Sequence, residues 1–345
     1  MRREPDMSRK RRQIAVFFTG GTIAMRHAAD GTVRPALHAA DLLAGLPGPL
    51  PEDVELRPVD WADLPSPHMT PELMFRLAGD VQDMLARPEI AGAVVAHGTD
   101  VMEESAFMLD LLVDTAKPVI ITGSMRSHDE AGYDGLRNLS SAVRACLLPL
   151  PPGIGAVLLM TDKLFAAREV TKVHSMGVDA FDAPGSGPLG TCVAGGVQLF
   201  RLPVPHAPLR TKRLESRVDL VTLAPGMDGR IIAFCRDSGA KGLVVEGFGA
   251  GNVPPGALEE IRRSVERGLP VVVTSRCIEG GVWPVYGYKG GANDLRDMGV
   301  ILGGNLRAQK ARILLMVGLG MVREDSPGGM APREAARRVF EAFPN

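Results

Sequence analysis

Short apolar runs of strand length alternate with amphipathic stretches of helix length along most of the chain. The runs that predict buried strands are residues 14–18, 93–96, 119–122, 156–160, 218–222, 243–246, 271–274 and 313–317. Strands that are apolar throughout are typical of sheets covered on both faces, which are mostly parallel because helices connect their strands. The pattern therefore predicts an α/β fold in which mostly parallel sheets lie between helices.

Three local signals indicate where helices begin and end. Thr70 followed by Pro71 predicts an N-cap with proline at the first helical position, and apolar residues then recur at helical spacing as far as residue 85. Asp100 and Glu103 have the spacing of a capping box at a helix start. The helical stretch 258–267 is followed by Gly268, which predicts a C-cap.

The length of the chain, 345 residues, predicts two domains because a single hydrophobic core rarely grows that large. Residues 201–217 carry several prolines between flanking charges, as an exposed linker does. We therefore expect a basic N-terminal tail at 1–12, a larger N-terminal domain at 13–200, a linker at 201–217 and a smaller C-terminal domain at 218–345.

The charge balance argues against two classes of partner. The chain has 39 basic and 40 acidic residues and a formal net charge of -1, which offers no electrostatic footprint for nucleic acid or an anionic membrane. No segment is apolar for long enough to span a bilayer, and the run after the basic tail is too short for a secretory signal. We expect a cytoplasmic protein with no nucleic-acid or membrane partner.

Cysteine and histidine spacing gives no support for a metal centre. The four cysteines are far apart and form no CxxC pair, and the seven histidines include no HxxxH. Reduced thiols in a cytosolic protein are the simplest explanation. We expect no metal and no cofactor.

The first segment that could carry chemistry follows the first predicted strand. Two glycines, Gly20 and Gly21, allow a sharp turn that would place the hydroxyl of Thr22 above the carboxyl end of that strand. Ligands in open parallel sheets bind at this edge. The phosphate-binding motifs GxGxxG and GxxxxGK are absent. On these residues alone, a purely structural turn remains equally open.

A second strand also runs into a glycine turn and a helix start, at residues 94–104. Thr99 and Asp100 could simply cap that helix. Alternatively, free backbone N–H groups around Gly98 could bind an anion or an oxyanion, and the Asp100 carboxylate could bind a substrate ammonium. A third segment contains Lys172, which by itself is typical of solvated surface, so its role depends on the other two segments.

Read in order, these segments resemble the bacterial type I/II L-asparaginase family. The matching stretches are Thr-Gly-Gly-Thr-Ile-Ala at 19–24, His-Gly-Thr-Asp-Val-Met-Glu-Glu-Ser-Ala at 97–106, Lys-Pro-Val-Ile-Ile-Thr-Gly-Ser-Met-Arg at 117–126, Arg-Glu-Val-Thr-Lys at 168–172, Gly-Pro-Leu-Gly at 187–190, Gly-Phe-Gly-Ala-Gly-Asn at 247–252 and Gln-Lys-Ala-Arg-Ile-Leu-Leu at 309–315. Each is common alone, but the ordered set covers nearly the whole chain and is very specific.

The resemblance implies two α/β domains, a homodimer or homotetramer with active sites between subunits, and hydrolysis of L-asparagine to L-aspartate and ammonia through an acyl-enzyme. It implies that Thr22 is the nucleophile and that Thr99, Asp100 and Lys172 form a second catalytic cluster. The substrate-binding residues that we expect are Ser66, Gly21, Gly98, Thr99 and Asp100.

The chemistry of amide hydrolysis gives these residue types a reason. A carboxamide is a poor electrophile, so an acyl intermediate replaces one hard step with two easier ones. Thr22 is not N-terminal and has no α-amine to act as its base. Because an ordinary lysine is protonated at pH 7, we expect a Thr99–Lys172–Asp100 relay rather than a free-standing lysine base. Backbone N–H groups around Gly98 could stabilise the oxyanion by about 3–4 kcal/mol each.

The chain departs from the family in the loop that follows the nucleophile, where the family usually has a tyrosine. Residues 25–35 contain none, and the chain has only Tyr133, Tyr286 and Tyr288. Tyr286, Tyr288 or His27 could replace the missing group, although a loop histidine is more often surface.

Two further positions bear on the substrate. Ala250 stands where several relatives have a substrate-contacting asparagine, and Glu279 does not align with the acidic residue that a neighbouring subunit supplies. Besides L-asparaginase, the sequence therefore leaves open a glutaminase or another small-amide hydrolase, since one methylene gives only about 1–3 kcal/mol of discrimination. A transamidase acting on glutamyl-tRNA is disfavoured by the short tail and the charge balance. A catalytically weak amino-acid-binding homologue is the third alternative.

Overall fold

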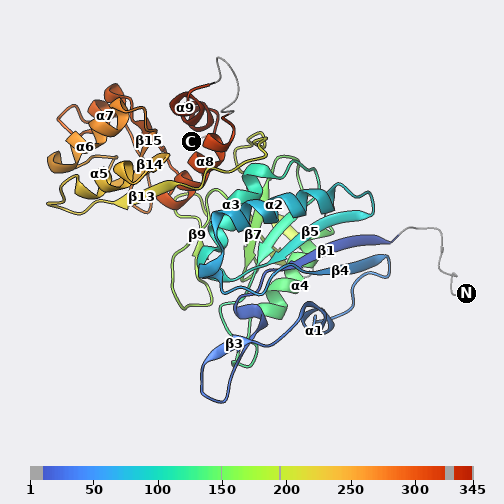
Figure 1. The fold of residues 1–345 in the computed structure, drawn as a ribbon. Coiled ribbons are helices and arrows are strands. Elements are labelled where there is room, and N and C mark those ends of the chain that lie inside the picture. Colours follow the sequence, from blue (N-terminus) through green and yellow to red (C-terminus); the bar gives the residue numbers. More distant parts are fainter. Residues whose placement is uncertain (1–10, 149, 194–195, 323–329, 344–345) are drawn as a thin grey trace, which may run out of the picture. The chain divides into compact units, whose positions relative to one another are not determined.

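The structure is a computed structural model that describes residues 11–148, 150–193, 196–322 and 330–343 (Figure 1). These residues form two compact units, 1–205 and 206–345, which divide within the segment 201–217. Residues 1–10 of the predicted tail lie outside the described residues, and Arg12 already belongs to the first strand.

Unit 1 is built on an eight-stranded sheet with the strand order β12-β11-β8-β7-β6-β5-β1-β4. Its strands are β1 (Arg12–Phe18), β4 (Val54–Asp60), β5 (Ile90–Ala96), β6 (Val119–Thr122), β7 (Ala156–Met160), β8 (Lys163–Ala166), β11 (Gly190–Val193) and β12 (Gly196–Leu199). Strands β4, β1, β5, β6 and β7 are parallel, and β8, β11 and β12 extend the sheet in antiparallel pairs. The prediction of a mostly parallel sheet is confirmed.

Two small pairs of strands project from this sheet. They are the hairpin of β2 (Met25–His27) and β3 (Val33–Pro35), and the pair of β9 (Thr171–Lys172) and β10 (Phe181–Asp182). The sequence pattern did not predict them because strands of two or three residues carry too little periodicity.

Helices cover both faces of the unit 1 sheet (Figure 1). They are α1 (Ala39–Ala44), α2 (Pro71–Leu85), α3 (Met102–Leu112) and α4 (Gly135–Cys146), and single 3₁₀ turns occur at η1 (Thr22–Ala24), η2 (Ser66–His68) and η3 (Thr99–Val101). Alternate residues of β1, namely Ile14, Val16 and Phe18, share a buried cluster with α4, and α2 and α3 lie together on the opposite face. Helix α2 begins as predicted, because the Thr70 hydroxyl accepts the Leu73 N–H at 3.3 Å.

The sheet of unit 2 is entirely parallel, in the order β13-β14-β15-β16. Its strands are β13 (Val218–Thr222), β14 (Gly242–Gly247), β15 (Val271–Ser275) and β16 (Ile301–Leu302). Its helices are α5 (Arg230–Asp237), α6 (Pro255–Glu266), α7 (Ala292–Met298), α8 (Ala308–Gly320) and α9 (Pro332–Ala342). Gly268 follows α6 with φ +81°, so the predicted helix end is confirmed.

The strand predicted at 313–317 is wrong, because these residues lie in α8. Every residue from Ile313 to Val317 is buried, since α8 packs on the sheet on one side and on α9 on another. A helix that is buried on all sides has the same continuous apolar run as a buried strand, so periodicity cannot separate the two.

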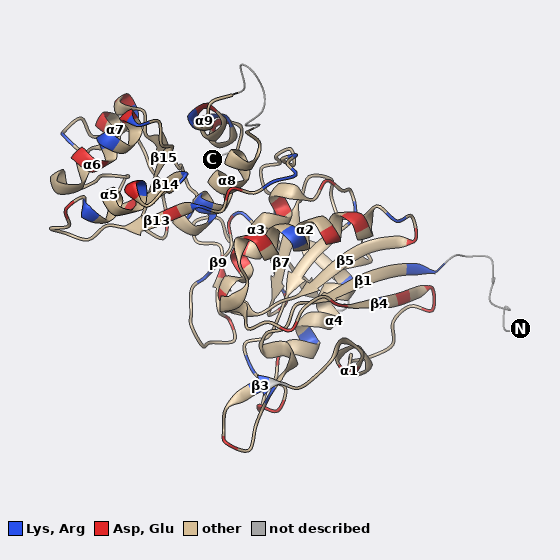
Figure 2. Ribbon diagram, viewed as in Figure 1, with Lys and Arg blue, Asp and Glu red and all other residues tan. Residues whose placement is uncertain are grey.

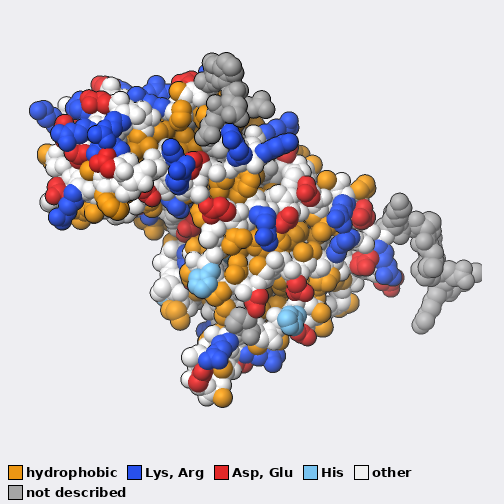
Figure 3. Space-filling view, in the orientation of Figure 1, with side chains coloured by type: hydrophobic (Ala, Val, Ile, Leu, Met, Phe, Trp, Pro, Cys, Tyr) orange, Lys and Arg blue, Asp and Glu red, His pale blue; other side chains and the backbone are white. Residues whose placement is uncertain are grey.

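Charged side chains of both signs lie along the elements of each unit (Figure 2), and they are interspersed with apolar side chains on the face seen in Figure 3. Within the described ranges, no helix is both long and apolar enough to cross a membrane. The same residues include no group of three or more His, Cys, Asp or Glu placed to hold a metal ion. The four cysteines are unpaired.

Candidate active site

The candidate site lies where the chain leaves the carboxyl ends of three neighbouring strands. Strands β4, β1 and β5 are adjacent and parallel, so the turns that follow them meet at one edge of the sheet. These turns carry Ser66, Thr22 and Thr99 respectively. Open parallel sheets bind their ligands at this edge.

Two glycines hold the turns after β1 and β5 against each other. A Cβ atom built on Gly21 would lie 2.3 Å from Gly98 Cα, and one built on Gly98 would lie 3.2 Å from Gly21 Cα. Gly21 also has φ +86°, which disfavours other residues. Thr22 directly follows Gly21 and Thr99 directly follows Gly98. The contact between the two glycines therefore brings the backbones of the two threonines close together.

Ser66 joins the same cluster from the turn after β4. Its Oγ accepts a hydrogen bond from the backbone N–H of Asp100 at 3.1 Å. A Cβ atom on Gly98 would lie 2.7 Å from Ser66 Cβ, so the serine packs directly on the glycine turn. Ser66 is buried, with 7% of its surface exposed. A small hydroxyl therefore lies beside the start of the Thr99 turn.

Lys172 lies on β9 and contacts both of its expected partners. Its Nζ donates to Thr99 Oγ1 at 2.9 Å and to Asp100 Oδ1 at 2.8 Å. The side chain of Lys172 is 13% exposed, whereas that of Asp100 is 56% exposed. The lysine is therefore enclosed between a buried hydroxyl and a carboxylate that still faces solvent and could bind a second cation.

Glu103 positions the strand that carries Lys172, and the capping-box prediction for it is wrong. Its Oε1 accepts the Thr171 hydroxyl at 3.0 Å and the backbone N–H of Lys172 at 3.3 Å. The 3₁₀ turn at 99–101 delays α3 until Met102, and Lys172 binds the Asp100 carboxylate that would have capped the helix. Glu103 therefore bonds Lys172, 69 residues away along the chain, and not the start of its own helix.

His97 lies beneath the glycine turn and is completely buried. Its Nδ1 is 2.7 Å from the carbonyl oxygen of Gly98, and its Nε2 is 2.9 Å from Ser105 Oγ. Because a carbonyl oxygen only accepts, we assign the ring proton to Nδ1 and the Ser105 hydroxyl as donor to Nε2. Burial lowers the pKa of His97 to about 4, so the ring is neutral at pH 7 and supports the turn without a charge. No local sequence pattern indicates this role.

The Thr22 hydroxyl is the least constrained polar group of the site. Thr22 is half-buried, and its Oγ1 makes no hydrogen bond to any residue that the structure describes. The hydroxyl is thus neither enclosed in core packing nor occupied by a structural contact.

Two family models match the chain in sequence order. The model described as "Asparaginase, N-terminal" matches residues 13–205, and that described as "Glutaminase/Asparaginase C-terminal domain" matches residues 217–326. The chain belongs to the asparaginase family. It is therefore a hydrolase that acts on amide C–N bonds.

Individual relatives agree over nearly the full length. The chain is 38% identical to a probable L-asparaginase of Deinococcus radiodurans, covering 95% of this chain and 97% of the relative. It is 34% identical to an L-asparaginase of Bacillus licheniformis, covering 91% and 97%. The crystal structure of a probable cytoplasmic L-asparaginase from Campylobacter jejuni matches with a TM-score of 0.82 and 29% identity, covering 96% of this chain and 100% of that one.

The groups expected to replace the family's loop tyrosine lie in different places. The His27 ring on β2 bonds Asp129, with Nδ1 and Oδ1 3.0 Å apart, and this hydrogen bond raises the pKa of His27. Tyr286 and Tyr288 lie in unit 2, where their ring centroids are 5.4 Å apart. Their expected role, and the roles discussed for Ala250 and Glu279 in the same unit, stay predictions.

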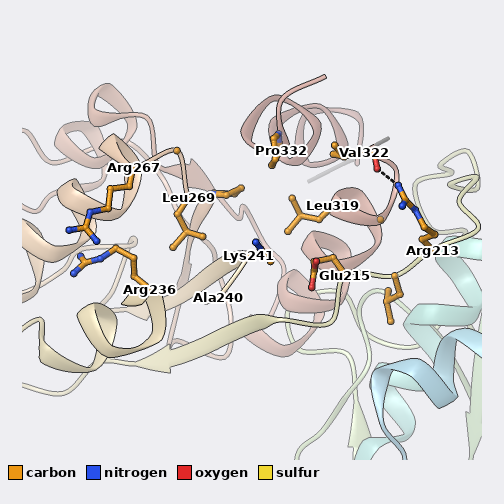
Figure 4. A pocket seen from close by; sticks show the side chains of 14 residues that line it. Arg213, Glu215, Arg236, Ala240, Lys241, Arg267, Leu269, Leu319, Val322 and Pro332 are labelled. Carbon is orange, nitrogen blue, oxygen red and sulfur yellow. Dashed lines mark hydrogen bonds between the residues drawn. The ribbon is translucent and has the colours of Figure 1, made fainter. Parts of the chain in front are cut away.

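Two cavities lie away from the predicted site residues. One of about 510 Å³ opens in unit 2 at the amino ends of β14 and β15, where its lining includes Glu215, Lys241 and Leu269 (Figure 4). The other, of about 430 Å³, lies beside α4 in unit 1 and includes Arg137 and Arg144. Neither contains a residue of the cluster around Thr22 and Lys172, and the first lies at the opposite sheet edge from the usual ligand site.

Proposed function

We propose that the protein is an L-asparaginase, which hydrolyses L-asparagine to L-aspartate and ammonia through an acyl-enzyme on Thr22. The main support for this proposal is the packing of the two glycine turns. The contact between Gly21 and Gly98 packs the turn of Thr22, whose hydroxyl bonds no described residue, against the turn of Thr99 and Asp100, and Lys172 of β9 is hydrogen-bonded to both of these residues.

Substrate binding follows from the charges of a free amino acid. The Asp100 carboxylate is half open to solvent and binds the α-ammonium beside Lys172. The Ser66 hydroxyl, which accepts the Asp100 N–H, donates to the α-carboxylate together with backbone N–H groups of the Gly98 turn. In the proposed complex, the side-chain amide of the substrate faces Thr22.

The reaction takes place in two halves. Thr22 Oγ1 attacks the amide carbon, and its proton passes through the Thr99–Lys172–Asp100 relay to the nitrogen that leaves as ammonia. Backbone N–H groups of the glycine turns stabilise the tetrahedral oxyanion. Water then attacks the β-aspartyl ester, the C–O bond to Thr22 breaks, and the proton returns to the threonine oxygen as aspartate leaves.

The proposal is tested by ammonia release from L-Asn, L-Gln and D-Asn, with Thr22→Ala measured beside the parent. We expect L-Asn to be the best substrate and the variant to lose turnover by several orders of magnitude. Faster release from L-Gln would identify a glutaminase on the same scaffold. No release from any amide, together with tight L-Asn binding, would identify an amino-acid-binding homologue and overturn the proposal.

We also propose a cytoplasmic homodimer or homotetramer. A structural relative described as probably cytoplasmic and the four unpaired cysteines support the location. Light scattering on the purified protein measures the mass of the assembly, and a monomer at working concentration would refute the oligomer.

A further inference from the structure

The chain that leaves Thr22 enters the β2–β3 hairpin, and a second loop holds the free edge of that hairpin. β2 pairs with β3 along one edge. Along the other edge of β2, Met25 and His27 bond to His128 and Asp129. Just before β2, Ile23 in the turn η1 bonds to Tyr133 of the same loop. Met25 and His27 are two residues apart in an extended strand, so their contacts lie on the same side of β2.

The contacts of Met25 and His27 supply hydrogen-bond partners along the edge of β2 that pairs with no described strand. The His128 N–H donates to the carbonyl oxygen of Met25 at 3.0 Å. The His27 N–H donates to Asp129 Oδ2 at 2.9 Å, while the His27 ring lies 3.0 Å from Asp129 Oδ1. The Asp129 carboxylate thus occupies the position of a strand carbonyl. Both side chains are about 40% exposed (41% and 37%), so this part of the contact is weak and easily opened.

The third contact, between Tyr133 and Ile23, is the nearest to Thr22 in sequence, and the tyrosine side chain is closely packed. Tyr133 Oη donates to the carbonyl oxygen of Ile23 at 2.7 Å, one residue after Thr22. A Cβ atom on Gly135 would lie 2.4 Å from that hydroxyl oxygen, and the His128 ring packs on the tyrosine with centroids 4.9 Å apart. Burial raises the pKa of Tyr133, so the hydroxyl keeps its proton and donates across the working pH range.

We propose that Tyr133 is a positioning residue for Thr22, and that His128, Asp129 and Tyr133 form a clamp that holds the nucleophile's turn and hairpin in place. The inference rests on the proposed function, since it assigns Thr22 as nucleophile. The Thr22 hydroxyl bonds no described residue, so its direction depends on the backbone of η1. Tyr133 holds the carbonyl group of Ile23, the residue after Thr22 in that turn.

Hydrogen exchange tests the clamp without reference to activity. Tyr133→Phe removes only the hydroxyl and keeps the packed ring, and Asp129→Ala removes the carboxylate that accepts the His27 N–H. We expect each to accelerate amide exchange in peptides covering residues 22–36 by about two- to twelvefold, the effect of losing one hydrogen bond. The control is Asp179→Ala, which removes an exposed carboxylate bonded to Lys163 and Thr161 and leaves this exchange unchanged.

Kinetics tests the link to Thr22. We expect Tyr133→Phe to lower kcat for L-Asn by about two- to twelvefold with KM nearly constant, because the substrate-binding groups on the Gly98 turn are untouched. A residue that only stabilised the fold would lower the melting temperature and leave kcat per folded molecule unchanged.

Faster exchange with lower kcat supports the inference. Faster exchange with unchanged kcat overturns the positioning role, and unchanged exchange overturns the clamp. If the parent protein hydrolyses no amide, the proposed function fails, while the exchange data still decide whether the clamp exists.

Discussion

Replacement of Lys172 by methionine should abolish most turnover and leave the fold intact. Methionine keeps the length and apolar stem of the lysine but removes both hydrogen bonds from Nζ, to Thr99 Oγ1 at 2.9 Å and to Asp100 Oδ1 at 2.8 Å. The remaining backbone contact, from the Lys172 N–H to Glu103, is unaffected by the substitution.

The loss of turnover should be larger than the loss of folding free energy. Loss of a positioned proton-transfer group lowers kcat by about 10²–10⁴, equivalent to about 3–5.5 kcal/mol of transition-state stabilisation. The cost in folding should be about 1–3 kcal/mol, because the buried Thr99 hydroxyl loses its partner, whereas Asp100, whose side chain is 56% exposed, is rehydrated.

The assay is steady-state ammonia release with L-Asn, with chemical unfolding measured on the same samples. Lys172→Arg is the matched variant, because a guanidinium keeps the charge but does not give up its proton. A proton relay predicts that the arginine variant is nearly as slow as the methionine variant, and a purely electrostatic role predicts partial recovery. Turnover of Lys172→Met within about threefold of the parent would remove Lys172 from the mechanism.

Two further predictions concern the glycine turn. Gly98→Ala should lower kcat/KM by about ten- to a hundredfold, because its Cβ would lie 2.7 Å from Ser66 Cβ, while Gly79→Ala, whose Cβ meets nothing within 4 Å, should keep full activity; equal activities would show that the contact is irrelevant. His97 has a folded pKa of about 4, below its ordinary 6.5, so the unfolded chain binds the proton first as pH falls. The contribution of neutral His97 to the free energy of unfolding should be fully present above pH 6.5 and should fall by roughly 3 kcal/mol toward pH 4. Urea unfolding of His97→Gln should therefore show a shallower decline as the pH falls. An identical pH dependence in the variant and the parent would contradict the low pKa assigned to His97.

The strands that place the site could be predicted from sequence because their signals are local. Residues 14–18 and 93–96 are continuous apolar runs that end in glycine turns, and both form central parallel strands. Every residue of edge strand β4 is half-buried or exposed, and the strand contains Pro58, so the sequence has no comparable apolar run there. Residues 313–317 read as a strand although they lie in the helix at 308–320, because burial on all sides removes the helical periodicity.

The candidate site was predictable only where residue type and turn position coincide. Thr22, Thr99 and Asp100 follow glycines at strand ends, so the pattern pointed to them directly. The contact of Glu103 with Lys172 and that of Tyr133 with Ile23 join residues 69 and 110 positions apart. Nothing local distinguishes such pairs, because their partners are set by how the sheet edge brings separate loops together.

The most direct test is to trap the covalent intermediate. Acid quenching during turnover of L-Asn, followed by trypsin digestion and mass spectrometry, should find one aspartyl group on the peptide of residues 13–26, with fragment ions assigning it to Thr22. An aspartyl group on Thr99 instead, or steady turnover with no adduct on either threonine, would contradict the assignment of Thr22 as the nucleophile.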